Sequence, residues 1–451
     1  MHVGHLRSTV IGDALVRVLE HLGGTVLRQN HIGDWGTQFG MLVQYLIEHP
    51  DPRPTDDDAG PTMGRLAGLY RAARAVFETD DTFADRARRR VVALQAGEPG
   101  TVAVWRDIVA ESTRYFTDVY ERLGVRLGPA DAVGESFYNP MLPGVAADLH
   151  DAGVATVSAG ALCVFFDDVC GPDGTPVPLI VRKSDGGYGY ATTDLAAIRH
   201  RVNALHADRI LYVVDARQEL HFRMVFAAAR RAGWLPDALE VVHVPFGTVL
   251  GADGRPFKTR TGDTVRLVDL LTEAVRRARQ VVADKNPDLP ATELSRRARQ
   301  VGIGAVKYAD LSTSRTRDYT FDLDRMLALN GNTGVYLQYA HARVRSILAR
   351  AGDPPGAVTS EVELTGPERR LVLQLDAFGG VLAEVAATYE PHRLCGYLYA
   401  LAQTFSAFYE KCPVLRAAPT VRSNRLALCR LTGDTLRTGL DLLGLDAPEQ
   451  L

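Results

Sequence analysis

Hydrophobic positions near the N-terminus follow the spacing of an amphipathic helix. Over residues 6–22 apolar side chains recur at helical spacing, and the pair Gly23-Gly24 supplies a stop. A β-branched run at residues 25–31 and a loop at residues 33–40 follow. This order predicts a helix that leads into a parallel strand, the second half of a β-α-β unit.

The pattern changes twice in the next part of the chain. Residues 41–127 have helical spacing and many arginines, with a polar loop at residues 51–61, and predict a helical insertion. Strand signals resume at residues 161–166, 179–182, 209–215 and 240–246. A helix is expected to start near Thr192, Thr193 and Asp194, whose oxygens suit an N-cap. The alternation predicts an α/β fold with a largely parallel, doubly wound, Rossmann-like sheet that binds ligands at the carboxyl ends of its strands.

Beyond residue 246 the strand signals stop. A glycine-rich loop at residues 251–262 leads into helices at about 265–285 and 291–311, and from residue 336 onward only helices are expected. We therefore predict three parts. They are a Rossmann-like domain at residues 1–250 with the helical insertion at about 41–127, a connecting segment at 251–330, and an all-α domain at 331–451.

Composition narrows the class of protein. Of the 451 residues, 46% are hydrophobic and 23% are charged, which permits large cores and argues against disorder. The five cysteines form no CxxC pair, which favours a reducing compartment and argues against a disulfide framework or a structural zinc site. With no apolar run of roughly 20 residues and no signal-peptide pattern, we expect a cytoplasmic protein without a membrane partner.

The charges are unevenly distributed. The net charge is −3, but residues 392–437 hold seven basic residues against Glu410 and Asp434. The seven are Arg393, Lys411, Arg416, Arg422, Arg425, Arg430 and Arg437. Such a patch can contact phosphates, and it is equally typical of a solvated helical face.

Two stretches contain residues suited to nucleotide chemistry. His2 and His5 flank Gly4 just before the first helix, where first-turn N–H groups and the helix dipole attract anionic oxygens. The alternative is a chain terminus that happens to hold two histidines. The loop at residues 251–262 carries Lys258 and Arg260 among glycines and can close over a triphosphate. Taken alone, this loop is better interpreted as a plain surface hairpin.

Several longer blocks occur in order along the whole chain. Together with the two stretches above they resemble the class I aminoacyl-tRNA synthetases, and among these the arginyl-tRNA synthetase family. The blocks of resemblance are residues 2–9, 29–40, 135–144, 190–196, 302–311, 331–333 and 338–340.

The resemblance implies an ATP site and an arginine pocket. The ATP site would comprise the His-x-Gly-His block and a degenerate second class I signature, and its residues are His2, Gly4, His5, Lys258 and Arg260. Tyr190 and Asp194, four residues apart at a helix start, would line the arginine pocket, since a carboxylate pairs well with a guanidinium. Gln218 would hold the main-chain end of the substrate. Without the resemblance, Asp194 is better interpreted as a helix N-cap.

The same resemblance implies an activity and its partners. It implies ATP-dependent activation of L-arginine to arginyl-adenylate and transfer to tRNA(Arg), with ATP and Mg²⁺ as substrate and no tightly bound cofactor. The helical domain would bind the anticodon, with phosphate contacts by Arg422 or Arg425. The resemblance also suggests a monomer.

The chain differs from the family at its start. Family members carry a small domain and a strand ending in Ser-x-Asn-x-x-Lys ahead of the His-x-Gly-His block, and Met1 aligns with an internal position. Without that central strand its neighbours' buried backbone groups lose partners, each at about 1–3 kcal/mol, so destabilisation is expected. The alternatives are a fragment, a short paralogue in a specialised pathway, and a non-catalytic tRNA-binding relative. The histidines and the Tyr190, Asp194 and Gln218 set favour catalysis.

Overall fold

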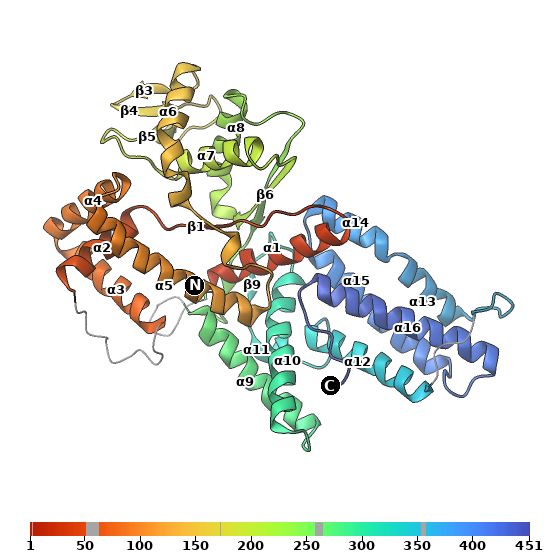
Figure 1. Cartoon of the computed structure of the whole chain (residues 1–451). Helices are drawn as coiled ribbons and strands as arrows, with labels where there is room; N and C mark the ends of the chain where they lie inside the picture. Colours follow the sequence, from red (N-terminus) through yellow and green to blue (C-terminus); the bar gives the residue numbers. More distant parts are fainter. Residues whose placement is uncertain (2, 51–62, 172, 258–264, 353–357) are drawn as a thin grey trace.

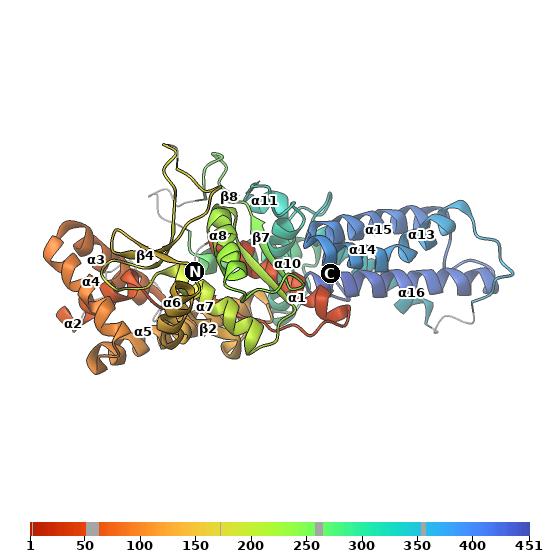
Figure 2. The same cartoon turned by 90° about the horizontal axis from the view of Figure 1, so that it is seen from above.

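The computed structural model describes residues 1, 3–50, 63–171, 173–257, 265–352 and 358–451, with only the backbone of residues 63–67. The polar loop expected at residues 51–61 lies outside these ranges. Figure 1 shows helix α1 near the middle, a helical insertion on one side, a small α/β part above, and a helical domain on the other side. The turned view in Figure 2 shows the helical domain as an elongated arm.

Helix α1 (Gly4–His21) confirms the first predicted helix. Its buried side chains are spaced about four residues apart, which places them on one face. They include Leu6, Val10, Ala14 and Val18. The helix ends at His21 with Leu22 as its C-cap, and Gly23 adopts a positive φ of 92°, a conformation that L-residues with side chains rarely adopt.

Two parallel strand pairs flank α1. Strand β6 (Arg209–Asp215) pairs in parallel with β7 (Glu240–Phe246), and both lie exactly where the sequence predicted them. Strand β1 (Asn30–Ile32) pairs in parallel with β2 (Ala132–Gly134). The predicted strand at 25–31 was therefore largely wrong, because residues 24–29 have no strand partner within the described ranges. A β-branched run forms a strand only where a neighbour accepts its hydrogen bonds.

The remaining strands are not all parallel. Strands β3 (Thr156–Ser158), β4 (Ala161–Val164) and β5 (Leu179–Arg182) form an antiparallel unit, while β8 (Val249–Leu250) pairs in parallel with β9 (Tyr319–Thr320). Alternate residues of β5 are buried, as in an antiparallel sheet with one covered face. The α/β class is confirmed, and the described strands form four small sheets of two or three strands.

The region predicted as a helical insertion is helical. It contains α2 (Thr37–Glu48), α3 (Met63–Thr79), α4 (Asp81–Gln95) and α5 (Pro99–Leu123). These helices share a core that includes Met41, Val43, Phe83, Ala87 and Ile108. Two 3-10 turns, η1 (Pro129–Asp131) and η2 (Glu135–Met141), and helix α6 (Leu142–Asp151) return the chain to the α/β part.

Helices α7 (Tyr190–Asn203) and α8 (Glu219–Arg231) pack together beside β5 to β7, and the short turn η3 (Ala216–Gln218) precedes α8. The N-cap predicted at residues 192–194 was wrong. Helix α7 starts earlier, with Gly189 at the N-cap and no side-chain cap bond. The Thr192 hydroxyl instead donates to the Val181 carbonyl, and Asp194 turns toward α8. The Asp194 carboxylate therefore does not cap α7.

The described chain from residue 265 onward is helical, as predicted, but the short strands β8 and β9 were not expected. Helices α9 (Leu267–Lys285), α10 (Ala291–Leu311) and the short α11 (Leu323–Met326) lead into α12 (Gly334–Ala351), α13 (Gly366–Asp376), α14 (Phe378–Thr388), α15 (His392–Lys411) and α16 (Pro419–Leu442). One continuous core joins α1, α9 and α10 to these helices, through side chains such as Leu6, Leu271, Val306, Leu337 and Leu398. The helical domain is thus packed against the helix that carries the His-x-Gly-His block.

Within the described ranges one helical stretch, Gly366–Thr388, is long and apolar enough to cross a membrane by length and composition, with a mean hydropathy of 1.4. It spans α13 and α14. Leu371 and Leu382 of this stretch lie in the core, and Glu368 forms an ion pair of 2.7 Å with Arg425 of α16. Because core helices of packed domains share this composition, the stretch is weak evidence for a membrane span.

Candidate active site

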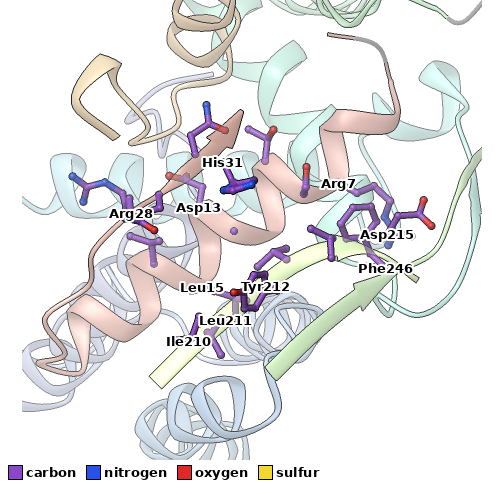
Figure 3. Close-up of a pocket in the computed structure, with 18 of the residues that line it drawn as sticks. Arg7, Asp13, Leu15, Arg28, His31, Ile210, Leu211, Tyr212, Asp215 and Phe246 are labelled. Carbon is purple, nitrogen blue, oxygen red and sulfur yellow. The ribbon is translucent and has the colours of Figure 1, made fainter. Parts of the chain in front are cut away.

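A cavity of about 2050 Å³ lies between the two parallel strand pairs. Residues 24–31 line one side, residues 208–215 line the other, and α1 runs along it. Figure 3 shows His31 on the side of β1 and Tyr212 and Asp215 on the side of β6. Among the described strands, β1 pairs only with β2, and β6 pairs only with β7. Each of the two strands therefore has one edge without a strand partner, and these two edges border the cavity. The cavity therefore reaches the carboxyl ends of both strands, where α/β folds bind ligands.

The first turn of α1 opens onto this cavity. Gly4 and His5 line it, and both are exposed. The N-cap residue Val3 makes no side-chain cap bond, and the first turn carries no acidic side chain. The Val3 N–H donates to the Val265 carbonyl at 3.0 Å, which anchors the helix start to the segment before α9. Such a helix start directs the positive end of the helix dipole toward the cavity, which favours an anion there.

The glycine-rich loop at residues 251–262, the second element predicted to bind phosphates, is only partly described. Its cations Lys258 and Arg260 lie outside the described residues, as does His2 of the first element. The near end of the loop folds as a tight hairpin, in which the Gly251 N–H donates to the Arg255 carbonyl at 2.8 Å and Gly254 has a φ of 70°. Pro256 and Phe257 line the cavity just before the two cations. The described part of this loop therefore borders the same cavity as α1.

The residues predicted to bind arginine also meet at the cavity. Tyr190 and Asp194 lie one turn apart on α7, and Gln218 ends the turn that follows β6. All three line the same space as Gly4 and His5. Tyr190 and Gln218 are exposed, whereas only 13% of the Asp194 side chain is exposed. A half-enclosed carboxylate between exposed polar groups suits a cationic ligand.

Sequence reasoning gave no role to Glu135, which lines the same cavity at the start of η2. Burial and, to a smaller extent, the negative charges of Asp194 and Asp34 together raise the pKa of Glu135 to about 8. Asp34 itself accepts hydrogen bonds from the Ser136 backbone and hydroxyl at 2.9 and 2.6 Å. Glu135 fell within a block of family resemblance, but no local pattern pointed to a partly buried carboxyl with a raised pKa.

A buried arginine lies behind these carboxylates. The Arg201 guanidinium donates to Gln29 Oε1 at 2.6 Å and to the Tyr212 hydroxyl at 2.8 Å, and it lies 5.1 Å from the Tyr212 ring. Arg201 lines the cavity, and its charge interacts favourably with Asp194. It offsets part of the negative charge that Asp194 and Glu135 bring to the site.

The two arginines proposed to contact tRNA lie on α16, away from the cavity. Arg422 donates to the Ala351 carbonyl at 3.0 Å. Arg425 donates to Glu368 at 2.7 Å and to the Pro413 carbonyl at 2.8 Å, and 12% of its side chain is exposed. Both guanidinium groups are thus engaged within the helical domain.

Comparison with known proteins agrees with this geometry. A family model described as tRNA synthetases class I (R), catalytic domain, matches residues 1–323, and one described as DALR anticodon binding domain matches residues 337–451. The arginine–tRNA ligase of Frankia casuarinae is 63% identical over 100% of this chain and 77% of its own length. That of Streptomyces coelicolor is 57% identical over 100% of this chain and 78% of its own length.

Solved structures show the same similarity in space. The arginyl-tRNA synthetase of Plasmodium falciparum has a TM-score of 0.84 and 31% identity, covering 100% of this chain and 74% of that chain. The Thermus thermophilus arginyl-tRNA synthetase has a TM-score of 0.83 and 28% identity, covering 100% of this chain and 80% of that chain. The similarity therefore extends over both the α/β part and the helical part.

Proposed function

The chain belongs to the class I arginyl-tRNA synthetase family and acts as an arginine–tRNA ligase, and we propose that it activates arginine in the cavity between β1 and β6. One observation carries this proposal. The start of α1, the foot of the second signature loop and the Tyr190, Asp194 and Gln218 set line a single cavity.

The substrate arginine brings a guanidinium at one end and an ammonium and a carboxylate at the other. Asp194 supplies the carboxylate that pairs with the guanidinium, and Tyr190 flanks it. Gln218, exposed at the carboxyl end of β6, holds the polar main-chain end of the substrate. Glu135 faces the same cavity, and its ionised form adds a second negative charge for a doubly cationic ligand.

ATP, as its Mg²⁺ complex, is the second substrate. We place its phosphates at the first turn of α1, with His2, Gly4 and His5, and assign Lys258 and Arg260 to the departing pyrophosphate. A carboxylate oxygen of arginine forms a bond to the α-phosphorus while the bond to pyrophosphate breaks, which yields arginyl-adenylate. The side chains act by holding both substrates in line and by stabilising the redistributed charge.

In the second step a terminal ribose hydroxyl of tRNA(Arg) attacks the arginyl carbonyl, and AMP leaves. The helical domain supplies the tRNA contacts. Phosphate contacts by Arg422 and Arg425 require their guanidinium groups to leave their present partners. Arg430 and Arg437 of α16 have 63% of each side chain exposed and form longer ion pairs, at 4.0 and 3.5 Å, with the exposed Asp434, so they are the stronger candidates.

We also propose a cellular location and an assembly state for the chain. All five cysteines are free, which fits a reducing cytoplasm. We propose that the protein acts there as a monomer. Light scattering of the purified protein checks the assembly, and a dimer mass would contradict it.

The test of the activity is exchange of labelled pyrophosphate into ATP, measured with and without arginine and with and without tRNA(Arg). We expect arginine-dependent exchange in at least one of the tRNA conditions, and its absence in both would overturn the proposal. Asp194→Ala should abolish arginine binding. The control Asp237→Asn changes a fully exposed carboxylate outside the cavity and should leave the exchange unchanged.

A further inference from the structure

His221 makes direct contact with the proposed arginine-binding carboxylate. Its Nε2 atom lies 2.6 Å from Asp194 Oδ2, and the contact joins the first turns of α8 and α7. Both side chains line the cavity, with 27% of His221 and 13% of Asp194 exposed. Among the described residues, this is the one recorded hydrogen bond to the Asp194 side chain.

The position of the imidazole is set by its own helix. His221 follows η3, whose N-cap Asp215 accepts a hydrogen bond from the Arg217 N–H at 2.9 Å, so the helix start is tied to the end of β6. The edge of Phe222 packs near the imidazole, with ring centres 5.1 Å apart at 79°. The ring is thereby aimed across the gap between α8 and α7.

An aspartate carboxylate on a helix has little torsional preference of its own, because its last torsion is broad and two-fold. A hydrogen bond to one oxygen fixes the plane of the carboxylate. With His221 on Oδ2, the Oδ1 atom and a further lone pair of Oδ2 remain for a planar guanidinium. Since an ionised carboxylate only accepts hydrogen bonds, the imidazole Nε2–H is the donor in this contact.

The guanidinium of Arg201, whose charge also acts on Asp194, does not fix the plane of the carboxylate. Arg201 directs its guanidinium to Gln29 and Tyr212, and no hydrogen bond between Arg201 and Asp194 is present. Its influence on the carboxylate is therefore long-range, whereas His221 sets the direction of the oxygen atoms. Only the His221 contact is directional enough to select a planar, forked donor.

We infer that His221 is a positioning residue for the amino-acid substrate, which fixes the Asp194 carboxylate in the plane that a guanidinium requires. This inference rests on the proposed arginine pocket and adds a specificity determinant to it. The plain structural alternative is that the pair only joins α7 to α8, in which case its loss would affect stability and not the choice of substrate.

The test compares Asp194→Asn, His221→Leu and His221→Gln in arginine-dependent pyrophosphate exchange with saturating tRNA(Arg). His221→Leu removes the donor and should raise the KM for arginine roughly 10- to 100-fold, with the KM for ATP changed less than about twofold, because a hydrogen bond to a charged group is lost. His221→Gln keeps an N–H donor in a similar place and should recover most of the affinity. The melting temperature of each variant is measured alongside.

The double variant Asp194→Asn/His221→Leu makes the test decisive. If His221 acts through Asp194, the double variant has about the same KM for arginine as Asp194→Asn alone. An unchanged KM for arginine in His221→Leu, or effects that multiply in the double variant, would overturn the inference. An unchanged KM in Asp194→Asn would instead overturn the proposed pocket, so the two failures are distinguishable.

Discussion

The Arg7 guanidinium lies 3.4 Å from the Asp310 carboxylate, and the side chains are 1% and 0% exposed. Arg7 also donates to the Arg317 carbonyl at 2.8 Å. This buried pair joins α1 to α10 and to the segment that leads into β9. Since β9 pairs with β8 at the start of the glycine-rich loop, the two elements that we propose to bind ATP share one internal support.

Replacing Arg7 tests that support. Arg7→Met leaves the Asp310 charge buried without its partner, so we expect a loss of about 3–5 kcal/mol in the free energy of unfolding. The control Arg88→Met breaks a pair with Asp85 whose side chains are 61% and 64% exposed, and should cost less than about 1 kcal/mol. Thermal or urea unfolding measures both. Equal costs for the two variants would contradict the buried-charge argument.

We expect the buried Lys307 to make the free energy of unfolding depend on pH. Its ammonium donates to the Leu123 carbonyl at 2.9 Å and to the Gly444 carbonyl at 2.6 Å, so it joins α10 to α5 and to the segment after α16. Burial lowers the pKa of Lys307 from 10.5 to about 8, although nearby Asp13 favours the charged form. Between these two values the unfolded chain holds a proton that the folded protein has lost, so the free energy of unfolding rises with pH.

The variant Lys307→Met has no such linkage. We expect the unfolding free energy of the natural chain, relative to Lys307→Met, to increase by up to about 3 kcal/mol between pH 8 and 10.5. The difference should be constant below pH 7. Unfolding curves of both proteins across this range measure it, and parallel curves throughout would show that Lys307 does not titrate in this range.

For Glu135 we expect the free energy of unfolding to change with pH in the opposite direction, and at lower pH. Its folded-state pKa of about 8 lies above the ordinary 4.5, so the folded protein holds an extra proton between these values. Stability is therefore lost as the pH rises through this window. Glu135→Gln removes the effect and should raise the melting temperature above pH 8 while changing it little near pH 5. A shift of equal size at both pH values would contradict this account.

The same variant should impair substrate binding. If ionised Glu135 attracts the cationic substrate, the KM for arginine of the natural chain falls between pH 7 and 8.5, and Glu135→Gln flattens this dependence. The measurement is pyrophosphate exchange at several pH values, with the KM for ATP as the internal reference. If Glu135→Gln has a higher melting temperature and also a higher KM for arginine, the carboxyl of Glu135 contributes to substrate binding at a cost in stability.

At Gly302 helix α10 lies so close to α9 that we expect no larger side chain to fit. An added Cβ would lie 2.8 Å from the Val275 Cα and 2.9 Å from the Ala274 carbonyl carbon and oxygen, which are backbone atoms that cannot move alone. Gly302→Ala should therefore destabilise by about 1–3 kcal/mol. The control Gly396→Ala, in α15 with nothing within 4 Å, should stabilise by about 0.4–1 kcal/mol. Opposite signs in thermal unfolding are the expected result.

Local patterns predicted those elements whose signal lies within a few residues. Strands β6 and β7 were found to the residue, and α1 within two residues, because a β-branched run or a helical stripe records burial directly. Family resemblance brought together Tyr190, Asp194 and Gln218, and the structure places all three at one cavity. Their roles stay proposals.

Other features depended on neighbours distant in the sequence. The run at residues 25–31 looked like a strand, yet only its last part pairs, with β2 about a hundred residues later. Asp194 looked like an N-cap, but α7 begins four residues earlier and the carboxylate meets His221 of α8. No local pattern marks His221, and none marks the raised pKa of Glu135, which requires burial and two other carboxylates.

The sequence by itself determined the α/β class, the helical second half, the ends of the central strands and the family. The tertiary structure decided which edges of β1 and β6 border the cavity, which carboxyl is buried, and which histidine orients Asp194. The physical reason is the sequence distance over which each kind of interaction acts. Periodicity and capping act within about one helical turn, whereas desolvation, ion pairing and strand partnership depend on atoms that only folding brings within a few ångströms.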